Sequence, residues 1–452
     1  MKFVAKKFSP ARLFDKQSKI LIKNSSWVLM ANLFRTGLVF LRSIVVARGL
    51  GAELYGTYAI VVAFVETVQQ FFNFNVPTSL IKFGAAFRTR NRTDQLVALL
   101  KAGAFVSLIS AVASVFIIAI LITFSYDTFI EQDGLYWFIV FYAMVACVFL
   151  FDNLSTALLR IFDKFKFNSL VQIVMAVVEF SIIAFTIYLY PRNLTYFFVA
   201  VIAAKLLNSL IINGMAMWEL RAELLPYAKS KMALISAERK EMTQFTFGNS
   251  VGQSVITIMN KGDVLLLAAL AGPAAVGLYA VAKKLAFSIL IITDPLKYTI
   301  FPQLSSLISK GKYRDIKKML FRITGVSLLP SLVFLVGMFY LNEWIITLFY
   351  GDEYAGASAS FFYLFMAATM ASVFFWNLSM IQSLGIIKFR FYVYAVAIAA
   401  GGGLAWYLIP AMGAEGAAIG HLVLKMIIII AFTGLTYKRL NSLQSEIGNE
   451  LK

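Results

Sequence analysis

The chain is poor in the residues that most metal centres and many active sites require. Its 452 residues include one cysteine, Cys147, and one histidine, His421. One cysteine cannot close a disulfide within the chain, and these two residues cannot supply a zinc-binding cluster. No phosphate-binding glycine-rich loop is present. We therefore expect no catalytic residues, no metal and no cofactor, and we predict that the protein is not an enzyme.

Neither of these two single residues indicates a chemical role by itself. Cys147 lies in an apolar run, where a packing role is expected. His421 could relay protons, or it could be a hydrogen-bonded interior residue. The sequence leaves both interpretations of the histidine open.

Charged residues are also scarce, and this scarcity indicates a membrane protein. Only 14% of the residues are charged and 60% are apolar, whereas soluble domains are about 25% charged. Several apolar runs exceed the roughly 18 residues that suggest a membrane-spanning helix. The alternating segments of an outer-membrane barrel are missing. The sequence therefore predicts an all-α integral membrane protein.

The apolar runs predict about twelve transmembrane helices in two six-helix lobes. The predicted regions are a basic N-terminal segment (1–24), an N-lobe (25–218), a linker (219–244), a C-lobe (245–436) and a C-terminal tail (437–452). The predicted spans are 26–47, 54–80, 97–124, 135–159, 169–190, 195–218, 245–271, 274–300, 320–341, 359–384, 389–409 and 414–436.

Acidic residues are outnumbered by basic ones, 23 to 41, which gives a net charge of +18. With the N-terminus inside, the cytoplasmic segments hold 31 of the 41 Lys and Arg, whereas the outer loops hold only Arg48 and Arg192. This asymmetry follows the positive-inside rule and predicts that both termini are cytoplasmic. The basic excess is thus a topology signal, and we expect no nucleic-acid partner. Segment 1–24 could lie on anionic lipid as an amphipathic strip.

A short motif occurs twice, 221 residues apart. GAELYGTYA begins at Gly51 and GPAAVGLYA at Gly272, and both fit G-x-x-x-x-G-x-Y-A. The copies are six spans apart, so the two halves share one orientation, which predicts a pseudo-two-fold axis along the membrane normal. Four fixed letters could also match by chance. If the repeat is real, Gly51, Gly56, Gly272 and Gly277 form two outer hairpins that close lobe against lobe as an outer gate.

Thirteen charged residues lie inside the predicted spans, besides Lys101, Arg322, Arg390 and Glu415 near the span ends. A cation that faces lipid at mid-membrane costs about 2.5 to 3.5 kcal/mol, so most must face a water-filled cavity, pair with an acid, or extend to the interface. Arg35 and Arg42 are seven residues apart and share one helix face. The cations are Arg35, Arg42, Lys205, Lys261, Lys283, Lys284, Lys297 and Lys425, and the acids are Glu66, Asp152, Glu179, Asp263 and Asp294.

A cavity lined by cations and amides suits an anionic substrate that is rich in hydroxyl groups. For the substrate-binding cations we predict Arg35, Arg42, Lys261, Lys283 and Lys297. For the polar lining we predict Gln69, Gln70, Asn73, Asn249, Gln253 and Asn260. Glu66, Asp263 and Asp294 are candidates for ion or proton coupling, because protonation could break their ion pairs. A static structural role remains open for these acids and for the cations, above all Lys205 and Lys425.

Four segments resemble the polysaccharide-transporter branch of the multidrug/oligosaccharidyl-lipid/polysaccharide (MOP) exporter superfamily, that is, Wzx-type oligosaccharide flippases. They are RSIVVARGLGAELYGTYAIVVAF (42–64), KGDVLLLAALAGPAAVGLYAVAKKL (261–285), YGDEYAGAS (350–358) and GAEGAAIGHLV (413–423). The resemblance implies movement of undecaprenyl-diphosphate-linked oligosaccharides, such as O-antigen or capsule units, from the cytoplasmic to the outer leaflet of the cell membrane. It implies alternating access, membrane lipids as surroundings, and glycan polymerase and assembly proteins as partners.

Three other functions compete with this interpretation. Peptidoglycan-precursor flippases of the same superfamily typically have fourteen spans, whereas this sequence predicts twelve. A multidrug antiporter exports organic cations and should favour acidic cavity residues, whereas eight cations here accompany five acids. A membrane glycan polymerase or ligase commonly has a sizeable outer loop, whereas the longest predicted outer loop is 342–358.

Overall fold

The computed structural model describes residues 16–129 and 135–450, so most of the predicted segment 1–24 lies outside the described residues. Within those two ranges every regular element is helical and no strand occurs, which confirms the all-α prediction. Helices satisfy their own backbone hydrogen bonds, which lipid cannot do for them. The apolar runs of this sequence therefore fold as long helices.

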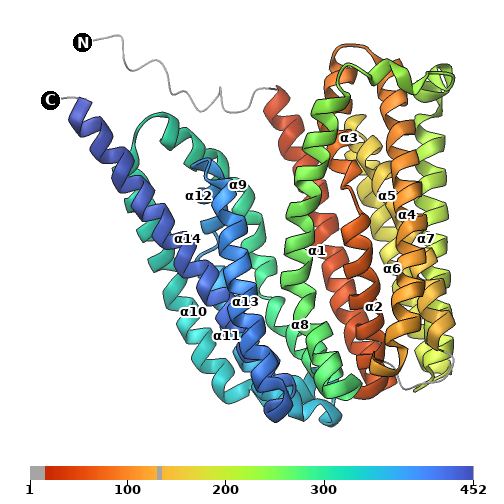
Figure 1. Ribbon diagram of the computed structural model, residues 1–452, viewed down its shortest axis with the longest axis vertical. Helices are drawn as coiled ribbons and strands as arrows, with labels where there is room; N and C mark the ends of the chain where they lie inside the picture. Colours follow the sequence, from red (N-terminus) through yellow and green to blue (C-terminus); the bar gives the residue numbers. More distant parts are fainter. Residues whose placement is uncertain (1–15, 130–134, 451–452) are drawn as a thin grey trace.

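The N-lobe contains the first seven α-helices (Figure 1). They are α1 (Lys16–Leu50), α2 (Ala52–Phe72), α3 (Val76–Thr89), α4 (Thr93–Phe129), α5 (Leu135–Ile161), α6 (Phe165–Leu189) and α7 (Leu194–Leu224). Two short 3₁₀ helices, η2 (Leu225–Tyr227) and η3 (Met232–Ile235), form the connection to the C-lobe. Lys101 on α4 donates to the carbonyls of Ala228 and Ser230 at 2.6 and 2.9 Å, which holds this connection against the N-lobe.

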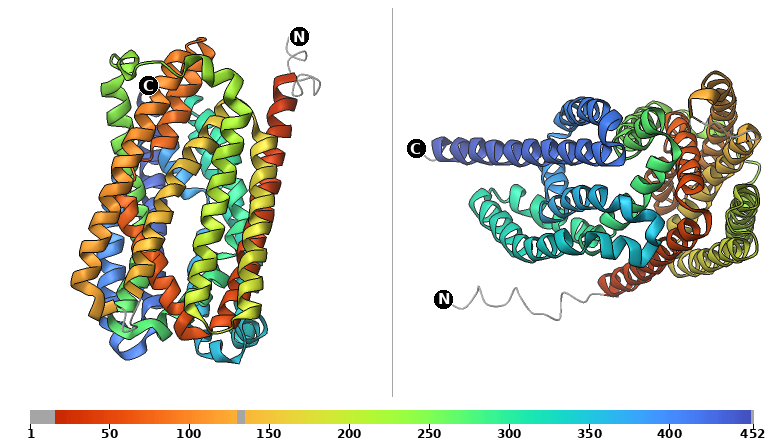
Figure 2. Two further views of the ribbon diagram at one scale, coloured as in Figure 1. Left: turned by 90° about the vertical axis from the view of Figure 1, so that its right-hand side faces the viewer. Right: turned by 90° about the horizontal axis from the view of Figure 1, so that it is seen from below.

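The C-lobe contains the remaining helices. They are α8 (Arg239–Phe287), α9 (Leu290–Ser309), α10 (Tyr313–Tyr350), η4 (Asp352–Ala357), α11 (Ser358–Val373), α12 (Asn377–Ser383), α13 (Ile387–Met412) and α14 (Ala414–Glu450). The view from below in Figure 2 shows the two lobes side by side, with α8 at their boundary. In Figure 1 the ribbons of the lobes diverge toward the end where α1 begins and α14 ends, here called the termini end.

Ten described helices are long and apolar enough to span a membrane, or eleven if the bent α2 and α3 count as one span. The predicted count of twelve therefore stays a prediction. Helix α8 is itself two helices, 239–271 and 273–287, because the backbone departs from helical geometry at Gly272 (φ 76°, ψ −178°). Gly51, between α1 and α2, has nearly the same conformation (φ 81°, ψ 170°). A positive φ of this kind favours glycine, so the repeated motif produces the same turn in both lobes.

Three predicted spans are interrupted, so the prediction of continuous helices there is wrong. In place of 54–80, α2 and α3 meet at a 45° bend. Asn75 takes the left-handed conformation (φ 48°), and Pro77 lies in the first turn of α3, where its missing N–H costs no helical hydrogen bond. In place of 274–300, the chain breaks between α8 and α9, where the Ser288 hydroxyl donates to the Leu285 carbonyl at 2.6 Å. In place of 359–384, it breaks between α11 and α12.

The end of the bundle that carries the two glycine turns, here called the hairpin end, is packed across both lobes. One buried apolar cluster includes Val46 and Leu50 of α1 together with Tyr279 of α8, Tyr350 of α10 and Tyr354 of η4. Toward the termini end, α3 of the N-lobe also contacts the start of α8, where the hydroxyls of Ser79 and Thr246 lie 2.6 Å apart and Lys82 pairs with Glu241 at 3.2 Å.

Candidate functional site

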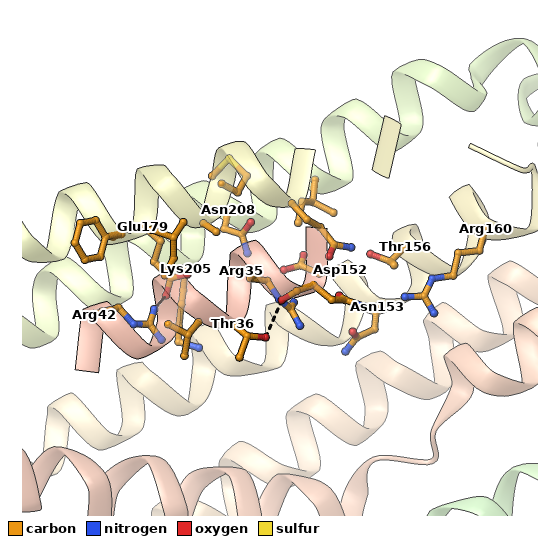
Figure 3. Close-up of a pocket in the computed structure, with 18 residues that line it drawn as sticks. Arg35, Thr36, Arg42, Asp152, Asn153, Thr156, Arg160, Glu179, Lys205 and Asn208 are labelled. Atoms are coloured by element: carbon orange, nitrogen blue, oxygen red, sulfur yellow. Dashed lines mark hydrogen bonds and ion pairs between the residues drawn. The ribbon is translucent and has the colours of Figure 1, made fainter. Parts of the chain in front are cut away.

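The N-lobe contains a polar cavity of about 500 Å³ between α1, α5, α6 and α7. Four cationic side chains and two carboxylates line it, so the cavity carries a positive excess. Figure 3 shows the labelled polar residues in a row, with Arg42 near one end and Arg160 at the other. The lining residues are Asn32, Arg35, Thr36, Leu38, Val39, Arg42, Asp152, Asn153, Thr156, Arg160, Gln172, Met175, Ala176, Glu179, Phe180, Lys205, Asn208 and Ile212.

Arg35 and Arg42 both line this cavity from α1, as their spacing of two helical turns requires. They differ in their partners. Arg42 forms an ion pair with Glu179 of α6. Within the described ranges, Arg35 has neither an ion pair nor a side-chain hydrogen bond, and its side chain is exposed. One guanidinium is therefore neutralised, and the other is free to accept an anion.

Two further cations line the cavity from other helices. Lys205 of α7 lies 5.4 Å from the centre of the Tyr142 ring, and Arg160 is near the end of α5. The sequence left the role of Lys205 open, and the predicted span 135–159 ended one residue before Arg160. Arg160 follows Thr156 by four residues and Asp152 by eight, so all three lie on one face of α5. This helical spacing is the sequence signal from which Arg160 could have been predicted as a cavity residue.

Asp152 is the second carboxylate of the cavity, and it belongs to a network of uncharged groups. The Ser209 hydroxyl and the Asn213 amide, both on α7, donate to its Oδ1, the amide at 2.7 Å. Ser155 in turn donates to Asn213 Oδ1 at 2.6 Å. Asp152 is 3% exposed. This network ties α5 to α7 and fixes the cavity wall.

The predicted cations Lys261, Lys283 and Lys297 do not line the N-lobe cavity. Each instead pairs with one of the three acids predicted for coupling. Lys261 on α8 pairs with Glu66 on α2 and so links the lobes. Lys297 pairs with Asp294 at 2.6 Å within α9. The third pair, between Lys283 and Asp263, is part of a larger cluster.

Asp263 is the centre of a buried polar cluster in the C-lobe. Lys283 at 2.6 Å, Tyr279 at 2.5 Å and His421 at 2.8 Å all meet its Oδ2. Lys283 also donates to the Asn260 carbonyl at 2.7 Å. The partner of His421 was not evident from the sequence, because 158 residues separate the two side chains. Within the described ranges, no group of three or more His, Cys, Asp or Glu could hold a metal ion.

The six predicted lining amides are not grouped around the N-lobe cavity. Gln69 turns toward α5, where its amide donates to the Ala143 carbonyl at 3.0 Å. Asn73 caps the bend, since its Oδ1 accepts from the Asn75 backbone at 2.9 Å. The other four are distributed along α2 and α8: Gln70, whose backbone carbonyl accepts from Ser254, the half-buried Asn249, and the exposed Gln253 and Asn260.

The hairpin end is closed by contacts between the lobes. A Cβ on Gly56 would lie 1.8 Å from the Pro273 carbonyl oxygen, and one on Gly277 would lie 1.9 Å from that of Ala52. Each glycine therefore packs against the turn of the other lobe. Glu353 of η4 adds a polar contact, since it accepts from the Ala52 backbone at 2.7 Å.

Side chains of α1 and of the loop after α6 complete this closure. Arg48 donates to the carbonyls of Leu348 and Phe349 at 2.5 and 2.8 Å, and Arg192 pairs with Glu353 at 3.2 Å. The Tyr354 hydroxyl donates to the Ala47 carbonyl at 2.9 Å. The sequence placed Arg48 and Arg192 in outer loops but did not identify their partners on α10 and η4.

Comparison with known proteins identifies both a family and a fold. A family profile described as "Polysaccharide biosynthesis protein" matches residues 21–308. No curated protein matches the chain in sequence.

Solved structures of two kinds of MOP transporter share the fold. A multidrug resistance MATE family transporter of the MOP superfamily, in an inward-facing conformation, has a TM-score of 0.68 at 13% identity and covers 91% of this chain and 96% of its own. The lipid II flippase MurJ, in an inward closed conformation, has a TM-score of 0.67 at 13% identity and covers 92% and 89%. An outward-facing MATE transporter has a TM-score of 0.61 at 15% identity and covers 94% and 96%.

Proposed function

Since this chain belongs to the polysaccharide biosynthesis protein family, we propose that it is a flippase that moves lipid-diphosphate-linked oligosaccharide units across the cell membrane. The units move from the cytoplasmic to the outer leaflet and serve the synthesis of surface polysaccharide. The observation that carries this proposal is the cationic cavity of the N-lobe, in which Arg35 is free to bind an anion.

The chemistry of the cavity suits a glycosyl diphosphate. A guanidinium binds two phosphate oxygens at once through its planar fork, and an ammonium adds a point charge. Arg35 and Lys205 supply these groups, while Asn153, Thr156 and Asn208 are polar neighbours suited to sugar hydroxyls. The prenyl tail stays in the bilayer, because the exposed surfaces of the spanning helices are apolar.

The proposed mechanism is alternating access. The hairpin end is closed by the Gly56 and Gly277 contacts, and the lobes diverge at the termini end. We assign the termini end to the cytoplasm, so this conformation receives substrate from inside. Rocking of the lobes then opens the hairpin end.

The acid–lysine pairs are the proposed coupling elements. Glu66 and Lys261 join α2 to α8 across the lobes, and Asp263 holds Lys283 inside the C-lobe. Protonation of either acid removes the attraction in its pair, and a change at Glu66 would alter a contact between the lobes directly. Asp294 and Lys297 are the third pair of this kind. We place glycan polymerase and assembly proteins downstream as partners, and the cell membrane as the location.

Two related functions share the same fold. The likeness to MurJ favours a peptidoglycan lipid-precursor flippase as the second candidate, because such a substrate also carries a diphosphate and sugars. The likeness to a multidrug transporter favours export of organic cations, but four cations around one cavity would repel such a substrate.

Deletion of the gene followed by analysis of the lipid-linked intermediates tests this proposal. We expect lipid-linked repeat units to accumulate on the cytoplasmic leaflet while cell-wall synthesis continues. Accumulation of peptidoglycan precursor instead would favour the second candidate. Normal surface polysaccharide without any accumulation would contradict the flippase function.

A further inference from the structure

We propose that the Glu179 carboxylate takes the place of the substrate phosphate, here called the stand-in role. It pairs with the Arg42 guanidinium while the cavity is empty and separates from it when the diphosphate binds. The inference deepens the proposed function and rests on it. It assigns Glu179 as a residue that sets the affinity of the cavity, a role that its sequence position in a long apolar run did not indicate.

The first observation is the position of the ion pair. Arg42 projects from α1 and Glu179 from α6, and both side chains line the cavity. Their exposed fractions are 23% and 25%, so the pair is partly shielded from water and still open to the cavity. Helices α1 and α6 pack against each other along their length. Glu179 thus occupies the position at which an anion in the cavity would reach Arg42.

The second observation is the contrast with Arg35. The two arginines share one face of α1 and line one cavity, but within the described part of the chain Arg35 has no partner. A substrate that enters from the termini end therefore reaches a free guanidinium first. Arg42, two turns deeper, becomes available only when its carboxylate partner moves away.

The third observation is that the other carboxylate of the cavity is held differently. Asp152 accepts from Ser209 and Asn213, which are uncharged donors on α7. Loss of an anion from that network would leave a hydroxyl and an amide without an acceptor. Of the two acids that line the cavity, Glu179 is the one that pairs with an arginine. When a phosphate displaces Glu179, the Arg42 guanidinium becomes available to bind the substrate.

The exchange conserves charge-assisted hydrogen bonds. Arg42 releases a carboxylate oxygen and binds a phosphate oxygen, with bonds of the same kind before and after. The released carboxylate stays close to Lys205, which Figure 3 shows beside Glu179 and Arg42 and which also contributes positive charge to the diphosphate site. Competition of this kind lowers the affinity for the diphosphate, which also eases its release after transport.

The test measures binding of farnesyl diphosphate, a short prenyl diphosphate, to the purified full-length protein by calorimetry. The variants are Glu179→Gln, which keeps the side-chain shape but removes the charge, and Glu179→Asp, which keeps the charge on a shorter side chain. Glu241→Gln is the matched control, because it also removes an ion-paired carboxylate but lies outside the cavity, opposite Lys82.

We expect Glu179→Gln to bind the probe about threefold to tenfold more tightly than the wild type, as loss of competition from one partly exposed ion pair predicts. Glu179→Asp should be intermediate, and Glu241→Gln should match the wild type. The gain should disappear in the double variant Arg42→Gln/Glu179→Gln.

Two outcomes separate this inference from the proposed function. If the wild type binds the probe and Glu179→Gln binds it equally or more weakly, the stand-in role is wrong while the flippase proposal remains. If no form of the protein binds the probe, the assignment of the cavity as a diphosphate site is wrong, and so is the inference about Glu179.

Discussion

Gly56 and Gly277 pack reciprocally across the lobe interface, each against the backbone of the other lobe's glycine turn. An added Cβ would lie 1.8 Å from the Pro273 carbonyl oxygen in the first case and 1.9 Å from that of Ala52 in the second. The near equality of the two distances is what a pseudo-two-fold axis between the motifs would produce. Closure of the hairpin end therefore depends on the absence of a side chain at both positions.

The first prediction is that Gly56→Ala and Gly277→Ala each loosen the hairpin end to a similar degree. The backbones must separate to admit a methyl group, which should lower the free energy of unfolding by about 1 to 3 kcal/mol. Maleimide labelling of Leu50→Cys, introduced into a Cys147→Ser background, reports the opening, because Leu50 is 2% exposed.

The control for these variants is Gly214→Ala on α7, where an added Cβ meets no atom within 4 Å. It should not lower stability, because alanine favours a helix more than glycine does, and it should leave labelling unchanged. A labelling rate for Gly56→Ala equal to that of the control would show that the glycine contact does not keep this end closed.

The second prediction concerns Glu353, which joins the Ala52 backbone to Arg192. Glu353→Gln removes the charge from both contacts and should increase labelling of Leu50→Cys severalfold without unfolding the protein. Glu343→Gln is the matched control, since this exposed carboxylate of α10 has no ion pair within the described part of the chain. Equal labelling in the two variants would contradict a closing role for Glu353.

The third prediction separates the two arginines of the cavity. Arg35→Gln should weaken binding of a prenyl diphosphate and leave the melting temperature unchanged, because Arg35 has no partner among the described residues. Arg42→Gln leaves Glu179 without its cation, so the free energy of unfolding should fall by about 1 to 3 kcal/mol. Calorimetric binding and thermal unfolding in detergent measure the two effects. A loss of stability in Arg35→Gln with none in Arg42→Gln would contradict the assignment of Arg35 as unpaired and Arg42 as paired with Glu179.

The fourth prediction compares two carboxylates of the C-lobe. Asp263 is 9% exposed and meets Lys283, Tyr279 and His421, so Asp263→Asn leaves a buried cation without an acid and should cost about 3 to 5 kcal/mol of stability. Asp294 is 54% exposed, and its one ion pair among the described residues lies within its own helix, so Asp294→Asn should cost about 1 kcal/mol or less. Thermal unfolding of both variants tests the contrast, and equal losses would contradict it.

The sequence predicted the fold class because membrane helices follow from local composition. Membrane helices are recognised in the sequence as long apolar runs that contain few acidic residues. The breaks were not predicted, because a run such as 54–80 is apolar on both sides of the bend. Asn73, Asn75 and Pro77 mark the interruption, but three residues change the mean hydropathy of a 27-residue run only slightly.

The candidate site was predictable only in part, for a similar reason. Arg35 and Arg42 fall on one helix face, and helical periodicity reports such relations directly. Which acid pairs with which cation depends on contacts between distant helices, such as Arg42 with Glu179, 137 residues apart. Sequence reasoning therefore placed Lys261 and Lys283 beside the arginines in one cavity, whereas in the structure both belong to separate ion pairs.

The most direct test of the central proposal is a flipping assay in proteoliposomes. The substrate is a fluorescent short-chain prenyl-diphosphate disaccharide, and loss of its accessibility to an external quencher reports transfer between leaflets. We predict that the wild-type protein transfers the lipid much faster than empty vesicles, and that Arg35→Gln slows transfer about tenfold through lost binding. Transfer no faster than in empty vesicles, or equal rates for the wild type and Arg35→Gln, would contradict the account.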